Sequence, residues 1–242
     1  MNKTAVITGG SGDIGASCCK ILAESGYNIV FNYLNNKDFA ERLCNEIGPD
    51  KCIAVKCDIS NPSEVADFIN QVIKKFGSVD VLVNNAGISQ NGLFQDVTPC
   101  ELDKIIDINV KGAFFTSQEV VKFMLKNHHG SIINISSMWG ETGASTEVAY
   151  SMTKAALIGL TKALAKEVGP SGIRVNCITP GLIETKMNSC YTKEDLDVVV
   201  DETPLCRIGT PEDVAMAVKF LAGDDSQFIT GQVLGVNGGF VI

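Results

Sequence analysis

Histidine and tryptophan are scarce in this sequence of 242 residues, which has two histidines, His128 and His129, and one tryptophan. The two histidines are adjacent, and the nine cysteines, an odd number, include no Cys-x-x-Cys pair. A structural zinc site needs four ligands at workable spacings, so we expect no metal site. Cys57 and Cys177 stand inside apolar runs, where a free thiol behaves as a small hydrophobic side chain.

Basic residues are also few, since 20 lysines and arginines stand against 28 acidic residues and leave a formal net charge of −8. This charge argues against binding to nucleic acid or to anionic membranes. No apolar run approaches the ~20 residues that cross a bilayer, and residues 1–4 lack the apolar segment of a signal peptide. We therefore expect a cytoplasmic protein with no membrane or nucleic-acid partner.

Apolar segments of strand length alternate along the chain with amphipathic segments, and no repeat, low-complexity tract or linker divides them. This alternation is typical of βαβ units and a parallel sheet. We predict a single α/β domain over residues 1–242, a doubly wound Rossmann-type fold with a central parallel sheet of about seven strands. The predicted strands are Ala5–Thr8, Asn28–Tyr33, Cys52–Cys57, Val79–Asn84, Ser131–Ser136, Arg174–Ile178 and Gln232–Val236.

Two helices and one loop can be placed as well. Apolar residues recur at helical spacing after Tyr150, and this pattern stops at Gly169. Thr210-Pro211-Glu212-Asp213 forms a capping box with proline at the first helical position. No element is evident over residues 181–208, which we interpret as a substrate lid.

A glycine-rich turn, Thr8-Gly9-Gly10-Ser11-Gly12-Asp13-Ile14-Gly15, follows the first predicted strand and leads directly into a helix. Glycines let the backbone approach a pyrophosphate closely, and a helix N-terminus offers free N–H groups to that anion. A glycine-rich turn alone is a weak signal, but its place between a strand and a helix strengthens it. We interpret it as a dinucleotide site with contacts from Gly9, Ser11, Asp13, Ile14 and Gly15.

Further candidate cofactor residues follow the third and fourth predicted strands, because open α/β sheets bind ligands at the carboxyl ends of their strands. Asp58, followed by Ile59, suits an adenine amino group, although a turn or helix-capping role is the alternative. The small residues Asn85, Ala86 and Gly87 let a flat cofactor lie against the backbone, unless they form an ordinary loop.

The second predicted strand ends at Tyr33, where an NAD enzyme usually carries a carboxylate for the ribose 2′-hydroxyl. Such a carboxylate would repel a 2′-phosphate, and Lys37 follows close behind. We therefore predict NADPH as the cofactor, with NADH less favoured.

Tyr150 and Lys154 are spaced i and i+4 in a predicted helix and so share one face of it. A free tyrosine has a pKa of about 10. A nearby ammonium group, together with the positive oxidised nicotinamide ring, would lower this pKa. Ser137 ends the preceding strand and brings a hydroxyl to the same pocket. These groups suit proton transfer to a carbonyl oxygen.

Taken together with Asn109 and Pro180-Gly181, these motifs resemble the short-chain dehydrogenase/reductase family over essentially the whole chain. The closest broad resemblance is to its 3-oxoacyl-[acyl-carrier-protein] reductases, echoed in residues 204–215 and 229–239. The resemblance implies that the protein is an NADPH-dependent ketone reductase. It also implies that the protein assembles as a homotetramer. It also implies cofactor contacts from Pro180, Gly181, Ile183 and Thr185, besides Tyr150 and Lys154.

The resemblance implies the following catalytic roles. Tyr150 protonates the carbonyl oxygen as hydride arrives, and Ser137 hydrogen-bonds that oxygen. Lys154 holds the nicotinamide ribose and lowers the pKa of the tyrosine. Asn109 holds a water that passes protons to Lys154.

Two features depart from the family pattern. Asp13 stands where the family's glycine loop has its middle glycine, and a carboxylate there is unfavourable unless it points away from the phosphates or caps the helix. Carrier-protein reductases dock their acidic partner through basic residues at the pocket mouth. The corresponding positions in this sequence are His128 and Ser171. An acidic carrier protein would gain little electrostatic steering.

The loop between Ser137 and Tyr150 differs as well, and we expect substrate contacts from Ser137, Met138, Trp139, Glu141, Glu147 and Tyr150. This loop is similar to that of the reductases that convert a 5-aminopentanone modification on elongation factor P to its alcohol. A glutamate near the ketone would suit the amine of such a substrate. The alternative is that both glutamates cap turns or face solvent.

Three hypotheses follow. The first is a reductase of a small-molecule or carrier-borne ketone, of the 3-oxoacyl type. The second is the same chemistry on an aminoketone carried by a modified protein. The third is a non-catalytic NADPH-binding sensor, which the complete set of Ser137, Tyr150 and Lys154 disfavours.

Overall fold

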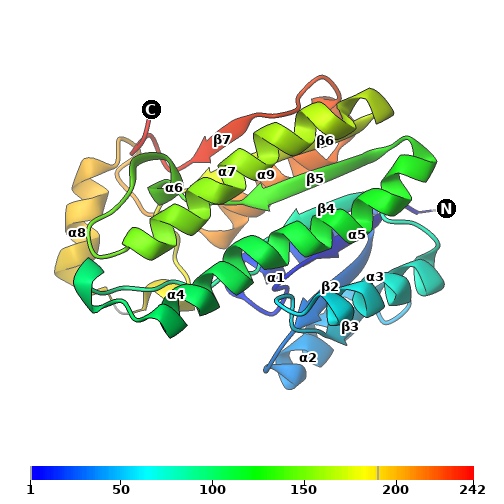
Figure 1. The fold of residues 1–242 in the computed structure, drawn as a ribbon, viewed down its shortest axis with the longest axis horizontal. Coiled ribbons are helices and arrows are strands. Elements are labelled where there is room, and N and C mark those ends of the chain that lie inside the picture. Colours follow the sequence, from blue (N-terminus) through cyan, green and yellow to red (C-terminus); the bar gives the residue numbers. More distant parts are fainter. Residues whose placement is uncertain (1, 190) are drawn as a thin grey trace.

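The computed structural model describes residues 2–189 and 191–242 and shows an α/β fold around one central sheet (Figure 1). Seven parallel strands form the sheet in the order β3-β2-β1-β4-β5-β6-β7. The predicted fold class is confirmed, and each predicted strand agrees with an observed one to within two residues at either end. The observed bounds are β1 Thr4–Ile7, β2 Asn28–Tyr33, β3 Cys52–Lys56, β4 Val81–Asn84, β5 Gly130–Ile135, β6 Ile173–Pro180 and β7 Val233–Val236.

Helical segments join each strand to the next. The α-helices are α1 Asp13–Glu24, α2 Lys37–Ile47, α3 Pro62–Phe76, α4 Pro99–Ile106, α5 Gly112–Asn127, α6 Trp139–Thr142, α7 Val148–Val168, α8 Lys193–Glu202 and α9 Pro211–Ala222. Short 3-10 turns are η1 Phe94–Asp96, η3 Gly169–Ser171, η4 Lys186–Asn188 and η5 Asp224–Ser226, and η2 Asp107–Lys111 is a π-helix.

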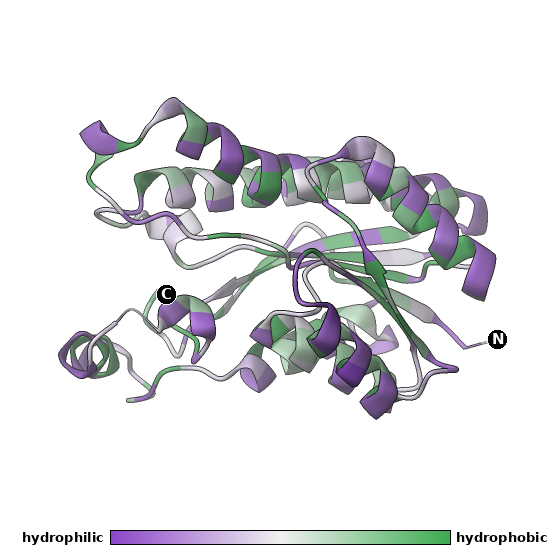
Figure 2. Cartoon of the chain, turned by 90° about the horizontal axis from the view of Figure 1, so that it is seen from below, coloured by the Kyte–Doolittle hydropathy of each residue, from purple (hydrophilic) through white to green (hydrophobic). Residues whose placement is uncertain are grey.

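Helices cover both faces of the sheet, as Figure 2 shows with the sheet seen nearly edge-on. Successive side chains of a strand point to opposite faces, so Ile7 packs in the core beneath α1, α2 and α9. Val6 packs in the core beneath α3, α5 and α7. Burial on both faces explains why the strands are nearly continuous apolar runs.

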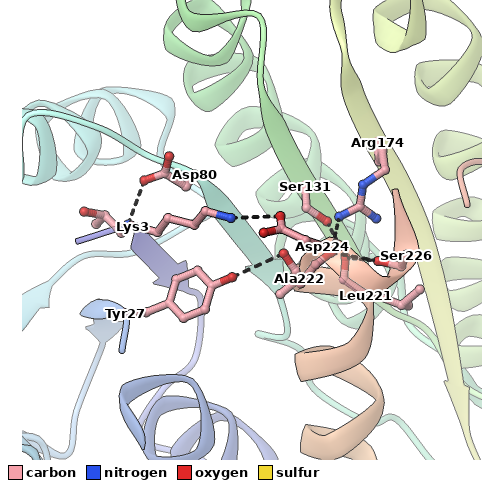
Figure 3. A network of polar contacts seen from close by, with 11 residues as sticks. Lys3, Tyr27, Asp80, Ser131, Arg174, Leu221, Ala222, Asp224 and Ser226 are labelled. Atoms are coloured by element: carbon pink, nitrogen blue, oxygen red, sulfur yellow. Dashed lines mark hydrogen bonds and ion pairs between the residues drawn. The ribbon is translucent and has the colours of Figure 1, made fainter. Parts of the chain in front are cut away.

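The end of α9 is tied to the amino ends of the strands (Figure 3). Tyr27, Ser131 and Arg174 donate to the last carbonyl groups of α9 and of the residue after it, at 3.3, 2.9 and 3.2 Å. These carbonyls have no partner within the helix, so side chains of the neighbouring strands satisfy them. At its start α9 has the predicted capping box, with Thr210 accepting from the backbone of Asp213.

The predicted lid, residues 181–208, does contain regular structure, contrary to expectation. It holds η4 and α8, and α8 begins at a capping box between Thr192 and Asp195. The helix was missed because its residues are mostly exposed, which leaves little apolar periodicity to detect.

Within the part of the chain that the structure describes, no helix is both long and apolar enough to cross a bilayer. The same residues contain no cluster of three or more His, Cys, Asp or Glu side chains arranged to hold a metal. The eight described cysteines are free thiols. Cys190, the ninth, lies outside the described residues.

Candidate active site

A cavity of about 510 Å³ opens at the carboxyl ends of the strands, where the strand order reverses between β1 and β4. Open α/β sheets bind ligands at this kind of switch point. Every residue predicted to contact the cofactor lines this cavity, namely Gly9, Ser11, Asp13, Ile14, Gly15, Tyr33, Asp58, Ile59, Asn85, Ala86, Gly87, Tyr150, Lys154, Pro180, Gly181, Ile183 and Thr185. Of the predicted substrate residues, Ser137, Met138, Trp139, Glu147 and Tyr150 line it as well.

Side chains from neighbouring strands hold the glycine-rich turn in place. Gly9 has a φ of +67°, which favours glycine, and its N–H donates to Asn32 Oδ1 at 2.8 Å. The hydroxyl of Thr8 accepts from the backbone N–H groups of Asn85 and Ala86 at 3.0 and 3.1 Å. These bonds link the carboxyl ends of β1, β2 and β4 to one another at the base of the cavity.

The start of α1 fits the pyrophosphate of a dinucleotide. The residue before the helix is Gly12, which has no side chain to cap it. The first backbone N–H groups of α1 therefore donate no side-chain capping bond to this residue and can bind an anion. A Cβ on Gly15 would collide with the carbonyl oxygen of Gly9, so the backbone is as close there as a phosphate site requires.

Asp13, at the first position of α1, points toward the lid. Its Oδ2 accepts a 2.7 Å hydrogen bond from the backbone N–H of Lys186. Asp13 is therefore not the cap of its own helix, and its carboxylate is bonded to the lid while it lines the cavity.

Asp58 forms a turn at the cavity wall. Its Oδ1 accepts from the backbone N–H and the hydroxyl of Ser60, at 2.9 and 2.7 Å. Asn61, rather than Asp58, caps α3. The helix-capping alternative for Asp58 is therefore wrong, and a cavity-lining turn residue remains.

The residues predicted to be catalytic, Ser137, Tyr150 and Lys154, lie between the end of β5 and the first turns of α7. The hydroxyl of Ser136 donates to the carbonyl oxygen of Lys154 at 2.7 Å, and Lys154 Nζ donates to the carbonyl oxygen of Ile135 at 2.9 Å. Tyr150 lies one helical turn before Lys154, and Ser137 follows the end of β5. All three residues line the cavity, with Lys154 Nζ 5.5 Å from the centre of the Tyr150 ring.

Burial is the largest influence on the pKa values of Tyr150 and Lys154. It raises the pKa of Tyr150 to about 12, against a lowering effect of the nearby Ser137 hydroxyl, and Glu147 raises this pKa further. Burial also lowers the pKa of Lys154 to about 8. Lys154 is not among the groups that shift the pKa of Tyr150 in the protein alone, and its ammonium group is bonded to a backbone carbonyl. The lowering of this pKa by Lys154 together with the oxidised nicotinamide ring stays a prediction.

Asn109 lies in the π-helix η2 and is almost completely buried, but it does not line the cavity. Its side chain bonds both backbone groups of Ile88, at 2.8 and 2.9 Å, and the hydroxyl of Thr153 at 3.1 Å. These contacts hold the loop after β4 against α7. A proton relay through Asn109 stays a prediction.

The two glutamates of the catalytic loop differ. Glu147 is buried at the start of α7, lines the cavity, and accepts a 3.1 Å hydrogen bond from the hydroxyl of Tyr191 in the lid. Burial raises the pKa of Glu147. Glu141 is exposed and does not line the cavity, so its predicted substrate contact finds no support in the shape of the cavity and stays a prediction. Trp139 lines the cavity and packs edge-on against Phe240 at 5.7 Å.

His128 and Ser171 do not lie at the pocket mouth, contrary to expectation. His128 ends α5 just before β5, and Ser171 lies just before β6. Both are therefore at the amino ends of parallel strands, and a strand of this length spans about 17–20 Å. The cavity is at the opposite edge of the sheet.

Several residues that line the cavity were missed in the sequence, namely Asn32, Asn36, Ser89, Asn91, Lys186 and Tyr191. Asn32 had a usable signal, since it is a polar residue at the carboxyl end of a buried strand. Lys186 and Tyr191 had none, because the lid brings them to the site from a distance in sequence.

The chain matches known proteins over nearly its whole length. A family model described as enoyl-(acyl carrier protein) reductase matches residues 10–241. The chain is 42% identical over 241 residues to 3-oxoacyl-[acyl-carrier-protein] reductase FabG of Staphylococcus epidermidis, covering 99% of each. It is similar to a structure of ElxO with NADP bound, with a TM-score of 0.92, 34% identity and 99% of each chain covered. It is also similar to 3-ketoacyl-(acyl-carrier-protein) reductase from Brucella melitensis complexed with NADH, with a TM-score of 0.94, 33% identity, and 99% and 98% of the two chains covered.

The chain belongs to the short-chain dehydrogenase/reductase family. It is accordingly an NAD(P)H-dependent oxidoreductase.

Proposed function

We propose that this reductase converts a ketone to an alcohol with NADPH, and that the ketone is a 3-oxoacyl group on an acyl carrier protein. The observation that carries the proposal is that Ser137, Tyr150 and Lys154 line one cavity, with Lys154 Nζ 5.5 Å from the centre of the Tyr150 ring. Two hydroxyl groups that line one cavity suit a single carbonyl oxygen. Relatives named as 3-oxoacyl-[acyl-carrier-protein] reductases support the choice of substrate.

When bound, the nicotinamide supplies the hydride. Ser137 orients the carbonyl oxygen, and Tyr150 donates the proton that this oxygen needs. Because burial raises the pKa of Tyr150 to about 12, the protein alone keeps the acid protonated at neutral pH. Lys154, a buried cation, holds the ribose hydroxyls of the cofactor and stays anchored to β5.

The preference for NADPH rests on Tyr33, which lines the cavity at the end of β2 without a carboxylate. Lys37 contributes less than its position in the sequence suggests. It lies at the exposed start of α2 and pairs with Glu41 at 3.3 Å, and it does not line the cavity.

A second candidate substrate is an aminoketone carried by a modified protein. The observation that favours it is Glu147, a buried carboxylate in the cavity one turn before Tyr150. An ammonium group on the substrate would find an ion-pair partner there. Positions 128 and 171 carry neither lysine nor arginine, but this does not support the aminoketone substrate. Both positions lie far from the cavity mouth.

The experiment that tests these proposals is a substrate panel with NADPH. It compares an acetoacetyl thioester, an aminoketone and a 2-enoyl thioester, with Tyr150→Phe as the control that lacks the acid. Fastest reduction of the acetoacetyl thioester supports the main proposal, and fastest reduction of the aminoketone supports the second. Reduction of the enoyl thioester alone would contradict both. NADPH binding without turnover of any compound would indicate a sensor.

A further inference from the structure

The lid meets the start of α1 through a hydrogen bond between two residues far apart in sequence. Asp13 Oδ2 accepts from the backbone N–H of Lys186 at 2.7 Å, and both residues line the cavity. Lys186 is the first residue of η4, so the bond holds the leading N–H group of that turn. Thr185 and Asn188, on either side, line the same cavity.

We propose that Asp13 is a positioning residue that seats the lid over the pyrophosphate end of the cavity before the cofactor binds. Any effect of this lid position on catalysis rests on the proposed NADPH-dependent function. The hydrogen bond that positions the lid does not depend on that function. A glycine at this position has no side-chain acceptor for Lys186. At the substrate end, Tyr191 donates to Glu147 at 3.1 Å, so the lid is anchored toward both parts of the cavity.

The carboxylate of Asp13 has a second effect through its charge. The N-terminus of α1 attracts anions, so it stabilises Asp13 and also attracts a pyrophosphate. Two anions at one helix end repel each other. We therefore expect the oxygen of Asp13 to seat the lid and its charge to weaken NADPH binding. Asp13→Asn keeps an acceptor oxygen and removes the charge, whereas Asp13→Gly removes both.

The seat can be measured without cofactor or substrate, by trypsin cleavage after Lys186. The Lys186 side chain is exposed, so its backbone contact with Asp13 is what we expect to protect the peptide bond. Asp13→Gly should be cut there at least about five-fold faster than the parent, because local opening becomes easier. Asp13→Asn should be cut at the parent rate. Cleavage at lysines outside the lid should stay unchanged in both, which shows that the variants are folded.

Asp38→Gly is a matched control, since Asp38 is also an acid in the first turn of a helix, α2. It should leave cleavage after Lys186 unchanged. By fluorescence titration, Asp13→Asn should bind NADPH about two- to five-fold more tightly than the parent. Equal cleavage of the parent and Asp13→Gly, or equally fast cleavage of both Asp13 variants, would overturn the proposal. A failure of the ketone-reductase proposal would appear separately, as no turnover by the parent.

A separate observation concerns Cys44 in α2 and Cys52, the first residue of β3. Their sulfur atoms lie 3.2 Å apart, and the short turn 48–51 joins the two elements. Cys44 is half-buried, whereas Cys52 is buried. A hydrogen bond from Cys52 lowers the pKa of the Cys44 thiol, so a thiolate forms more readily at Cys44.

We propose that this pair is a dithiol site that a peroxide oxidises to a disulfide. The Cys44 thiolate attacks one peroxide oxygen, the O–O bond breaks, and an alcohol or water leaves with a proton. The Cys52 thiol then attacks the resulting sulfenic sulfur, so that the S–S bond forms and water leaves. The two thiols lose two electrons and the peroxide gains them. The sulfurs must approach by about 1.2 Å, since an S–S bond is about 2.05 Å long.

The test is mild treatment of the protein with hydrogen peroxide, followed by mass spectrometry of unreduced peptides. We expect a link between Cys44 and Cys52 that dithiothreitol reverses, and no loss of turnover, because Cys52 lies at the end of β3 opposite the cavity. Cys52→Ser should instead accumulate sulfinic acid on Cys44. Cys100→Ser, which changes an exposed cysteine, should leave the link unaffected. Oxidation of Cys100 with Cys44 and Cys52 still reduced would contradict the proposal.

Discussion

The ammonium group of Lys154 is hydrogen-bonded to the carbonyl oxygen of Ile135 at 2.9 Å and lies 5.5 Å from the centre of the Tyr150 ring. The end of β5 therefore holds the lysine independently of the tyrosine hydroxyl. This relationship separates the two residues in mutational tests, because a change at Tyr150 leaves the cation in place.

Tyr150→Phe should lower turnover by at least about 100-fold, because general acid catalysis typically contributes this much. NADPH affinity should stay within a few-fold of the parent, since Lys154 and the glycine-rich turn are unchanged. Lys154→Ala should damage both. Steady-state rates and fluorescence titration of NADPH measure the two effects. Retention of about a tenth of the parent activity by Tyr150→Phe would show that another group is the acid.

The pH dependence should reflect Lys154 before Tyr150. Burial lowers the pKa of Lys154 to about 8 and raises that of Tyr150 to about 12, and both must be protonated for reduction. Because kcat/KM reports the free protein, we expect kcat/KM for NADPH to fall as the pH rises through about 8. Lys154→Arg keeps its charge, so this fall should vanish in it. A parent profile that stays flat well above this pH would contradict the prediction.

NADPH should have a higher kcat/KM than NADH, because Tyr33 leaves room for a 2′-phosphate that a carboxylate would repel. Tyr33→Asp should shift the preference toward NADH. Lys37→Ala is the matched control, and it should change the ratio little because Lys37 does not line the cavity. A parent that favours NADH would disprove the assignment of the cofactor.

Glu147 should favour a ketone that carries a nearby positive charge over its uncharged isostere. A charge pair in a partly desolvated pocket contributes about 1–3 kcal/mol, or about 5- to 150-fold in kcat/KM. Glu147→Gln should abolish the preference, whereas Glu141→Gln should not, because Glu141 is exposed. Since burial raises the pKa of Glu147, the preference should weaken as the pH falls through that pKa. Equal rates for both ketones in the parent would mean that Glu147 serves the lid contact alone.

We expect the protein to be a homotetramer. Large apolar side chains are exposed in the segment 93–94, on α5 and on α7, namely Leu93, Phe94, Phe114 and Met152, and on α9, β7 and nearby residues, namely Phe220, Phe228, Leu234 and Ile242. An interface between subunits would cover such side chains. Light scattering at micromolar concentration measures the assembly, and a monomeric mass would refute the expectation. Phe94→Ser should reduce the assembly if the first set is an interface.

Local chemistry determined much of the site in advance. Buried parallel strands are apolar on both faces, so the sheet was predictable from short runs of the sequence. Glycine spacing after β1 and the i, i+4 placement of Tyr150 and Lys154 are short-range patterns as well. Parallel strands bring their carboxyl ends to one edge, which is why residues predicted separately line one cavity.

Only the tertiary structure decided which polar side chains face that cavity. Glu141 and Glu147 stand in the same loop, yet the start of α7 buries one and the loop exposes the other. Asp13 finds its partner, Lys186, in a segment far along the chain. The pKa of Tyr150 depends on burial by several elements at once, which no local pattern records. Local sequence determines the elements and the short motifs, whereas orientation, burial and long-range contacts follow from how those elements pack.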